Sequence, residues 1–113
     1  MPRIYLDHNA TTPLVSPALD RFCSVARDIW GNASSVHHFG QQAKAVLDGA
    51  RASVAALLGA EPSEVVFTGG GTDGDNAAVR GALDALEAAG RRHLIISSIE
   101  HEAVLQTAKA LTR

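Results

Sequence analysis

Apolar residues in the middle of the chain recur at helical spacing. Over residues 36–58 they stand three or four positions apart, the spacing of one face of an amphipathic helix, and Gly59 follows as a helix-ending residue. A shorter helix is predicted before it, because Ser16 is a good N-cap and Pro17 is favoured at the first helical position. This first helix is expected to run to about Trp30, where a glycine and an asparagine follow.

Short apolar runs alternate with helical patterns in the second half of the chain. Residues 64–68 and 93–98 are predicted to be strands, and the lack of alternation in them suits a sheet buried on both faces. Helices are predicted over residues 72–90 and from about Glu100 onward. The order strand, helix, strand, helix implies an α/β fold with a mostly parallel sheet and covering helices. Because two strands are too few for a finished sheet, this fold is expected to be incomplete in the chain.

Composition and charge exclude several classes of protein. The 113 residues are 46% hydrophobic and 19% charged, with a net charge of −2, which suits one globular domain and argues against disorder. We expect no nucleic-acid or membrane partner, because the chain is not basic and contains neither a signal peptide nor a run of about 18 apolar residues. The single cysteine, Cys23, is predicted to be a buried structural thiol, and its lack of a partner favours a reducing, cytoplasmic location.

The glycine run of the segment FTGGGTDGDN, residues 67–76, is the strongest candidate for a binding site. It follows a predicted strand directly, and Thr72 or a neighbour is expected to cap the next helix. Glycines let a ligand approach the backbone, and the first amides of a helix favour an anion such as a phosphate. The segment is neither a Walker A motif, since the closing Lys-Ser/Thr pair is absent and Thr72 is followed by Asp73, nor a dinucleotide fingerprint. A purely structural glycine turn remains the alternative.

Two other polar segments carry candidate chemistry. SSIEHEAVL, residues 97–105, places His101 after the second predicted strand, at the sheet edge where ligands bind in open α/β folds. A histidine there can stack on a ring or relay protons, although an exposed histidine at a helix start is the alternative. LDHNATTP, residues 6–13, offers small hydrogen-bonding side chains for a substrate pocket, or else forms a polar turn.

A fourth segment, GNASSVHHFG, covers residues 31–40. Its adjacent histidines, His37 and His38, share no ligand spacing with a cysteine or a carboxylate, so no metal site is expected. The four segments, in this order and spacing, resemble the amino-terminal portion of a cysteine desulfurase. These are the NifS-like and IscS-like members of the class V aminotransferase family, which depend on pyridoxal 5′-phosphate. The resemblance extends from Tyr5 to the end of the chain.

The resemblance implies the start of a fold type I transferase. Residues 1–15 are expected to contribute to the small domain and the substrate pocket, and residues 16–113 to form the first part of the cofactor-binding large domain. Gly71 and Thr72 match the residues that hold the cofactor phosphate. His101 matches the catalytic histidine that stacks over the pyridine ring and assists proton transfer. The residues implied to lie near the substrate are Asn9, Ala10, Thr11 and Thr12.

The resemblance also implies an activity and partners. The whole enzyme would remove sulfur from L-cysteine, leaving L-alanine and an enzyme persulfide. It would be a homodimer and would pass the sulfur to an acceptor or scaffold protein for iron–sulfur cluster or thiolated cofactor assembly. The alternatives are another class V enzyme (a selenocysteine lyase or an aminotransferase), a truncated non-catalytic binding or dimerisation module, or a split enzyme that a second chain completes.

The chain departs from the family pattern in two ways. The family's Schiff-base lysine, its aspartate beside the pyridine nitrogen and its catalytic cysteine match no residue up to Arg113, and Lys44 and Lys109 are predicted to be surface residues. The chain alone is therefore expected to be inactive. The smaller departures are Gly69 for serine, Asp73 for glutamate, Gly74 for alanine or serine, and Ala33 for proline.

Overall fold

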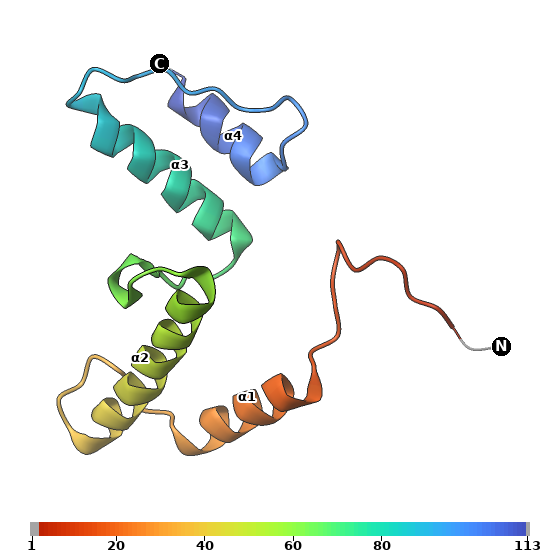
Figure 1. The fold of residues 1–113 in the computed structure, drawn as a ribbon, viewed down its shortest axis with the longest axis vertical. Coiled ribbons are helices and arrows are strands. Elements are labelled where there is room, and N and C mark those ends of the chain that lie inside the picture. Colours follow the sequence, from red (N-terminus) through yellow and green to blue (C-terminus); the bar gives the residue numbers. More distant parts are fainter. Residues whose placement is uncertain (1–2, 113) are drawn as a thin grey trace. The chain divides into compact units, whose positions relative to one another are not determined.

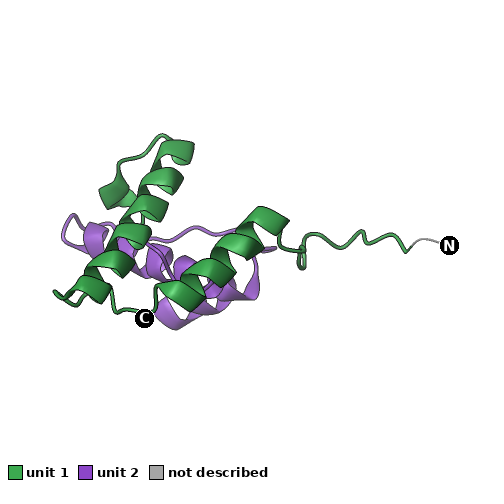
Figure 2. Ribbon diagram, turned by 90° about the horizontal axis from the view of Figure 1, so that it is seen from below, with its two compact units in different colours: residues 1–65 green, residues 66–113 purple. Residues whose placement is uncertain are grey.

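The computed structural model describes residues 3–112 and divides into two compact units (Figures 1 and 2). The first unit ends at Val65, and the second begins at Val66. The first contains α1 (Ser16–Asp28), α2 (His38–Leu58) and the short 3-10 helix η1 (Pro62–Glu64). The second contains α3 (Gly71–Glu87) and α4 (Glu102–Leu111), joined by an extended segment.

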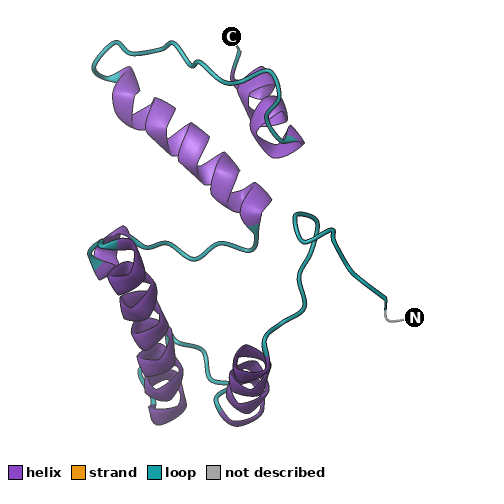
Figure 3. Ribbon diagram, turned by 45° about the vertical axis from the view of Figure 1, so that its right-hand side comes forward, coloured by secondary structure: helices purple, strands orange, loops and turns teal. Residues whose placement is uncertain are grey.

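Both predicted strands are absent from residues 3–112, so the predicted parallel sheet is not formed (Figure 3). Residues 65–70 and 91–97 are extended or bent and belong to no strand, and Glu64 belongs to η1. A strand persists only when its backbone amides and carbonyls pair with a neighbouring strand, and the described residues supply none. As a result Val66 is 77% exposed and Ile95 is 85% exposed, although both were expected in a buried sheet.

The helices lie close to their predicted positions. Gly59 ends α2 with a left-handed backbone, φ 66°, and its amide bonds to the carbonyl oxygens of the last turn, as predicted. The prediction that Ser16 caps α1 is wrong, because Ser16 is the first helical residue and Val15 occupies the N-cap without a side-chain bond. Cys23 on this helix is exposed, which overturns its prediction as a buried thiol.

Little of the molecule is buried within the described residues. The buried apolar side chains are the small ones of Ala55 and Ala103, and the buried polar one is Thr107. Direct packing between elements joins α3 to α4 and α2 to η1. None of the helices within residues 3–112 is both long and apolar enough to cross a membrane. The apolar stripes that predicted the helices therefore remain largely exposed.

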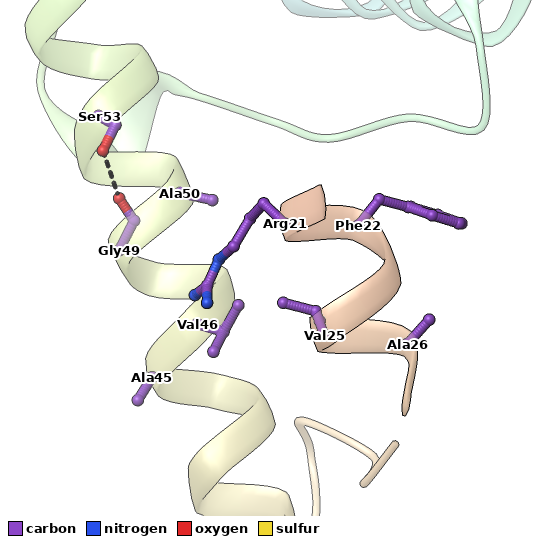
Figure 4. Close-up of a pocket in the computed structure, with 9 residues that line it drawn as sticks. All are labelled: Arg21, Phe22, Val25, Ala26, Ala45, Val46, Gly49, Ala50 and Ser53. Carbon is purple, nitrogen blue, oxygen red and sulfur yellow. Dashed lines mark hydrogen bonds between the residues drawn. The ribbon is translucent and has the colours of Figure 1, made fainter. Parts of the chain in front are cut away.

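An open groove of about 910 Å³ lies between α1 and α2 in the first unit (Figure 4). Its walls are mostly apolar, and within it Ser53 donates a hydrogen bond of 2.9 Å to the Gly49 carbonyl of its own helix. No residue singled out as a binding or catalytic candidate lines this groove. The lining residues are Arg21, Phe22, Val25, Ala26, Ala45, Val46, Gly49, Ala50 and Ser53.

Candidate functional site

Helices α3 and α4 lie side by side and run in the same direction, so their N-terminal ends meet at one end of the second unit (Figures 1 and 3). A hydrogen bond from the Thr107 hydroxyl to Asn76 Oδ1 fixes this alignment. Each of these residues is the sixth of its helix, counted from Gly71 and from Glu102. The structure thus brings the glycine segment and His101 to the same end of the helix pair, although thirty residues separate His101 from Gly71 in the sequence.

The N-terminus of α3 is open. Gly70 is its N-cap, and no side chain of the described residues caps it, so the prediction that Thr72 or a neighbour supplies the cap is wrong. The Gly70 carbonyl accepts from the Gly74 amide at 3.0 Å, which leaves the amides of the preceding helical residues without an intrahelical acceptor. Within residues 3–112, a Cβ added at Gly70 or Gly71 would meet no atom within 4 Å. This helix end therefore fits a phosphate group.

His101 caps α4 through its side chain. Its Nδ1 accepts a hydrogen bond from the Ala103 amide at 3.1 Å, and its carbonyl accepts from the amides of Val104 and Leu105. Because an accepting Nδ1 carries no proton, the neutral ring holds its proton on Nε2. The ring is exposed, so the cap fixes one edge of the imidazole and leaves Nε2 available to a ligand. The two alternatives predicted for His101 are therefore compatible with each other. The same side chain can cap a helix through Nδ1 and still offer its ring and Nε2 to a ligand.

The four residues implied to lie near the substrate share one exposed turn of the first unit. The backbone closes this turn through bonds from the amides of Ala10 and Thr11 to the Asp7 carbonyl, at 3.2 and 3.4 Å. The Tyr5 hydroxyl lies 2.9 Å from the Asp7 carbonyl oxygen and 3.1 Å from that of Thr11. His8 Nδ1 lies 3.3 Å from the Thr12 hydroxyl. Tyr5 and His8 thus support a turn that carries Asn9 at its exposed tip.

Comparison with known proteins decides the family. The sequence profile of the aminotransferase class-V family matches residues 4–113. The chain belongs to this family. It is 44% identical over 111 residues to the putative cysteine desulfurase IscS 1 of Bacillus subtilis, and 48% identical over 111 residues to a cysteine desulfurase of a Nostoc species. These matches include 98% of this chain but only 29% and 27% of the two relatives.

A solved structure supports the same assignment. A NifS-like protein matches with a TM-score of 0.86 and 35% identity, over 98% of this chain and 30% of its own. The resemblance to cysteine desulfurases is therefore confirmed for the amino-terminal portion that the chain represents. The chain spans less than a third of the length of these relatives.

Two of the departures from the family pattern face each other at the start of α3. The Asp73 carboxylate lies 2.7 Å from the position that a Cβ on Gly69 would take. In this class V chain the glycine thus leaves room for the carboxylate to turn back toward the helix end. Its negative charge is favourable near the positive end of the helix dipole, and it opposes an anion at the same amides. The phosphate fit therefore depends on backbone amides rather than on net positive charge.

The loop of residues 31–40 has a structural role in the described chain. A Cβ on Gly31 would lie 2.3 Å from the Phe39 carbonyl oxygen, and one on Gly40 would lie 2.2 Å from that of Ser35. His37 caps α2 by accepting from the Gly40 amide at 3.4 Å. Among residues 3–112, no group of three histidine, cysteine, aspartate or glutamate side chains is arranged to hold a metal ion.

Sequence reasoning missed the residues that support the candidate sites. Tyr5 and His8 hold the first turn, while Asn76 and Thr107 join the two helices of the second unit. No short motif pairs Asn76 with Thr107, because the bond depends on the register between two helices. Their common position as sixth residue of a helix becomes a signal only once the helices are known to be parallel.

Proposed function

We propose that this chain is the amino-terminal part of a cysteine desulfurase. The whole enzyme removes sulfur from L-cysteine and yields L-alanine and an enzyme persulfide, whose sulfur serves iron–sulfur cluster or thiolated cofactor assembly. Relatives with this name support the proposal at 44% and 48% identity. The structural observation that carries it is the open N-terminus of α3 beside the His101 cap of α4.

The second unit supplies part of a pyridoxal 5′-phosphate site. When bound, this cofactor provides an electron sink for bonds of the amino-acid substrate. The backbone amides of Gly71 and Thr72, together with the Thr72 hydroxyl, hold the phosphate at the start of α3. The His101 ring stacks on the cofactor, and its Nε2 holds or moves a proton while Nδ1 stays bonded to the Ala103 amide.

The first unit supplies part of the substrate pocket. Asn9, Ala10, Thr11 and Thr12 are all exposed, and the small polar side chains of the asparagine and the two threonines suit an amino-acid carboxylate. Residues 1–15 contribute to the small domain of the enzyme, and residues 16–113 form the first part of its large domain.

The chain lacks three groups that the complete reaction needs. The lysine that holds the cofactor covalently, the aspartate beside its pyridine nitrogen and the cysteine that accepts sulfur have no counterpart here. Lys44 donates a 2.6 Å bond to Asp48 on α2, and this bond is the main cause that lowers the pKa of Asp48. Lys109 lies in the last turn of α4. Since neither lysine lies at the candidate site, we expect the chain alone to be inactive.

The enzyme is a cytoplasmic homodimer that delivers sulfur to an acceptor or scaffold protein. The missing groups come from the rest of the same polypeptide or from a second chain that completes the fold.

The cofactor site can be tested directly on the chain. The probe is pyridoxamine 5′-phosphate, which has no aldehyde that could react with Lys44 or Lys109. Calorimetry compares its affinity for the chain with that of pyridoxamine, which lacks the phosphate. We expect binding that requires the phosphate. Gly71→Pro removes one amide at a helix position that tolerates proline, and it should weaken binding about tenfold, whereas Gly71→Ala keeps the amide and the affinity. Equal affinity for both probes contradicts the phosphate site.

The reaction is tested on the cofactor-loaded protein with its missing groups restored. Formation of alanine and of an enzyme persulfide from L-cysteine supports the proposal. Turnover only with L-selenocysteine identifies a selenocysteine lyase, and amino-group transfer to a 2-oxo acid identifies an aminotransferase. No binding of pyridoxamine 5′-phosphate, combined with stable self-association of the chain, identifies a non-catalytic dimerisation module.

A further inference from the structure

A chain of hydrogen bonds joins α4 to the first turn of α3. The Thr107 hydroxyl donates to Asn76 Oδ1, and Asn76 Nδ2 donates to the Thr72 carbonyl at 2.7 Å. Thr107 is only 4% exposed and Asn76 is half-buried, so the bond between them is partly shielded from water, whereas the bond from Asn76 to the Thr72 carbonyl is exposed. This series of hydrogen bonds ends at Thr72, a residue whose amide and hydroxyl belong to the proposed phosphate turn.

The Thr107 hydroxyl does not need a partner on another helix in order to form a hydrogen bond. A threonine or serine in a helix can donate to a carbonyl four residues earlier in its own helix. Thr112 does this with Ala108 at 3.2 Å, and Ser53 does it with Gly49 at 2.9 Å. Thr107 instead donates across the helix pair to Asn76.

The position of this bond connects both parts of the proposed cofactor site. Asn76 lies one turn after Thr72, and Thr107 lies less than two turns after His101. Apolar packing between two helices does not fix their register strongly, because it is non-directional, and the buried apolar residue in this unit is the small Ala103. A directional bond at the sixth residue of each helix does fix it.

We infer that Asn76 and Thr107 are positioning residues for the cofactor site. They hold the Gly71–Thr72 turn at a fixed separation from the His101 ring without touching the cofactor themselves. This inference rests on the proposed function for its purpose, but the mechanical link between the two helix ends is a property of the chain and can be measured without a ligand.

The first experiment measures hydrogen exchange by mass spectrometry on the ligand-free chain at low concentration. Thr107→Val removes the hydroxyl and keeps the β-branched shape, whereas Thr107→Ser keeps the hydroxyl. We expect about tenfold faster exchange in Thr107→Val over the first two turns of α3 and of α4, and nearly unchanged exchange in Thr107→Ser. Thr112→Val is the matched control, because its hydroxyl bonds only within α4.

Two outcomes of this experiment overturn the inference. Wild-type exchange rates in Thr107→Val show that the bond does not hold the helix ends. An equal acceleration along the whole of α3 and α4 shows a general loss of stability instead of a local loss of positioning.

The second experiment measures the affinity for pyridoxamine 5′-phosphate in variants that retain the helix content of the wild type. We expect about tenfold weaker binding in Thr107→Val and in Asn76→Asp, which loses the donor to the Thr72 carbonyl, and recovery in Thr107→Ser. Unchanged affinity in Thr107→Val refutes the positioning role. If the wild type does not bind the probe, the proposed cofactor site fails, while the exchange experiment still decides whether the link exists.

Discussion

At the scale of single residues, His101 has a structural role as a helix cap and a proposed chemical role, and substitution can separate the two. Its Nδ1 accepts the Ala103 amide at 3.1 Å, so His101→Ala leaves that amide without its acceptor. We expect His101→Ala to destabilise the start of α4 by about 1 kcal/mol, measured by hydrogen exchange at Ala103. His101→Asn should restore this protection, because asparagine is among the best N-cap residues.

The same pair of variants separates the helix cap from the proposed cofactor contact of His101. Asparagine has no aromatic ring to stack, so His101→Asn should lose affinity for pyridoxamine 5′-phosphate even though its cap is intact. Full affinity in His101→Asn would show that the ring acts only as a helix cap. Unchanged protection of Ala103 in His101→Ala would show that the Nδ1 bond contributes nothing to α4.

The sequence allows some site residues to be predicted and hides others. Gly71, Thr72 and His101 could be proposed because a glycine run before a helix and a histidine after a predicted strand are local sequence features, and the structure brings them to one end of a helix pair. Asn76 and Thr107 were missed because their bond joins residues thirty-one positions apart. A single sequence does not contain the register between two helices, which is set by packing.

At the scale of elements, Gly74 is a weak point in α3. Glycine costs up to about 1 kcal/mol relative to alanine in a helix, and a Cβ at this position would lie 3.5 Å from Thr68 Oγ1, an ordinary contact. We expect Gly74→Ala to stabilise α3 by about 0.4–1 kcal/mol, measured by hydrogen exchange along the helix. Gly59→Ala, at a left-handed position with φ 66°, should destabilise α2 instead.

The same glycine-to-alanine substitution is therefore expected to change helix stability in opposite directions at these two positions. A stabilising Gly59→Ala would contradict the left-handed end of α2. A destabilising Gly74→Ala would show that the space beside Thr68 is needed by another group, such as the Asp73 carboxylate that folds back over Gly69.

Helices were predicted from the sequence far better than strands, for a physical reason. An α-helix forms its bonds within four residues, so the apolar spacing over residues 36–58 and the stop at Gly59 are sufficient to place α2. A strand bonds to a distant segment. Residues 64–68 and 93–98 have strand-like composition, but no described segment forms a strand ladder with them, so within residues 3–112 they belong to no sheet.

At the scale of the whole molecule, exposed apolar side chains outweigh the buried ones. Ala55 and Ala103 are the buried apolar residues, while Leu6, Leu57, Val66, Ile95 and Ile99 are each more than three-quarters exposed. Hydrophobic burial is the main favourable contribution to folding, so the described residues gain little of it from their own contacts. In the relatives, which are more than three times as long as the matched segment, further residues are available to cover such side chains.

These exposed side chains lead to a prediction about association. Val66 and Ile95 lie in extended segments that have no partner strand within residues 3–112, and such segments pair with other chains. We expect the isolated chain to self-associate with rising concentration in sedimentation velocity, and Val66→Thr combined with Ile95→Thr to reduce this. Val36→Thr is the matched control, because Val36 is 91% exposed but lies in the loop before α2. If Val36→Thr reduces association as much as the double variant does, general hydrophobic exposure drives it, and the unpaired segments have no special role.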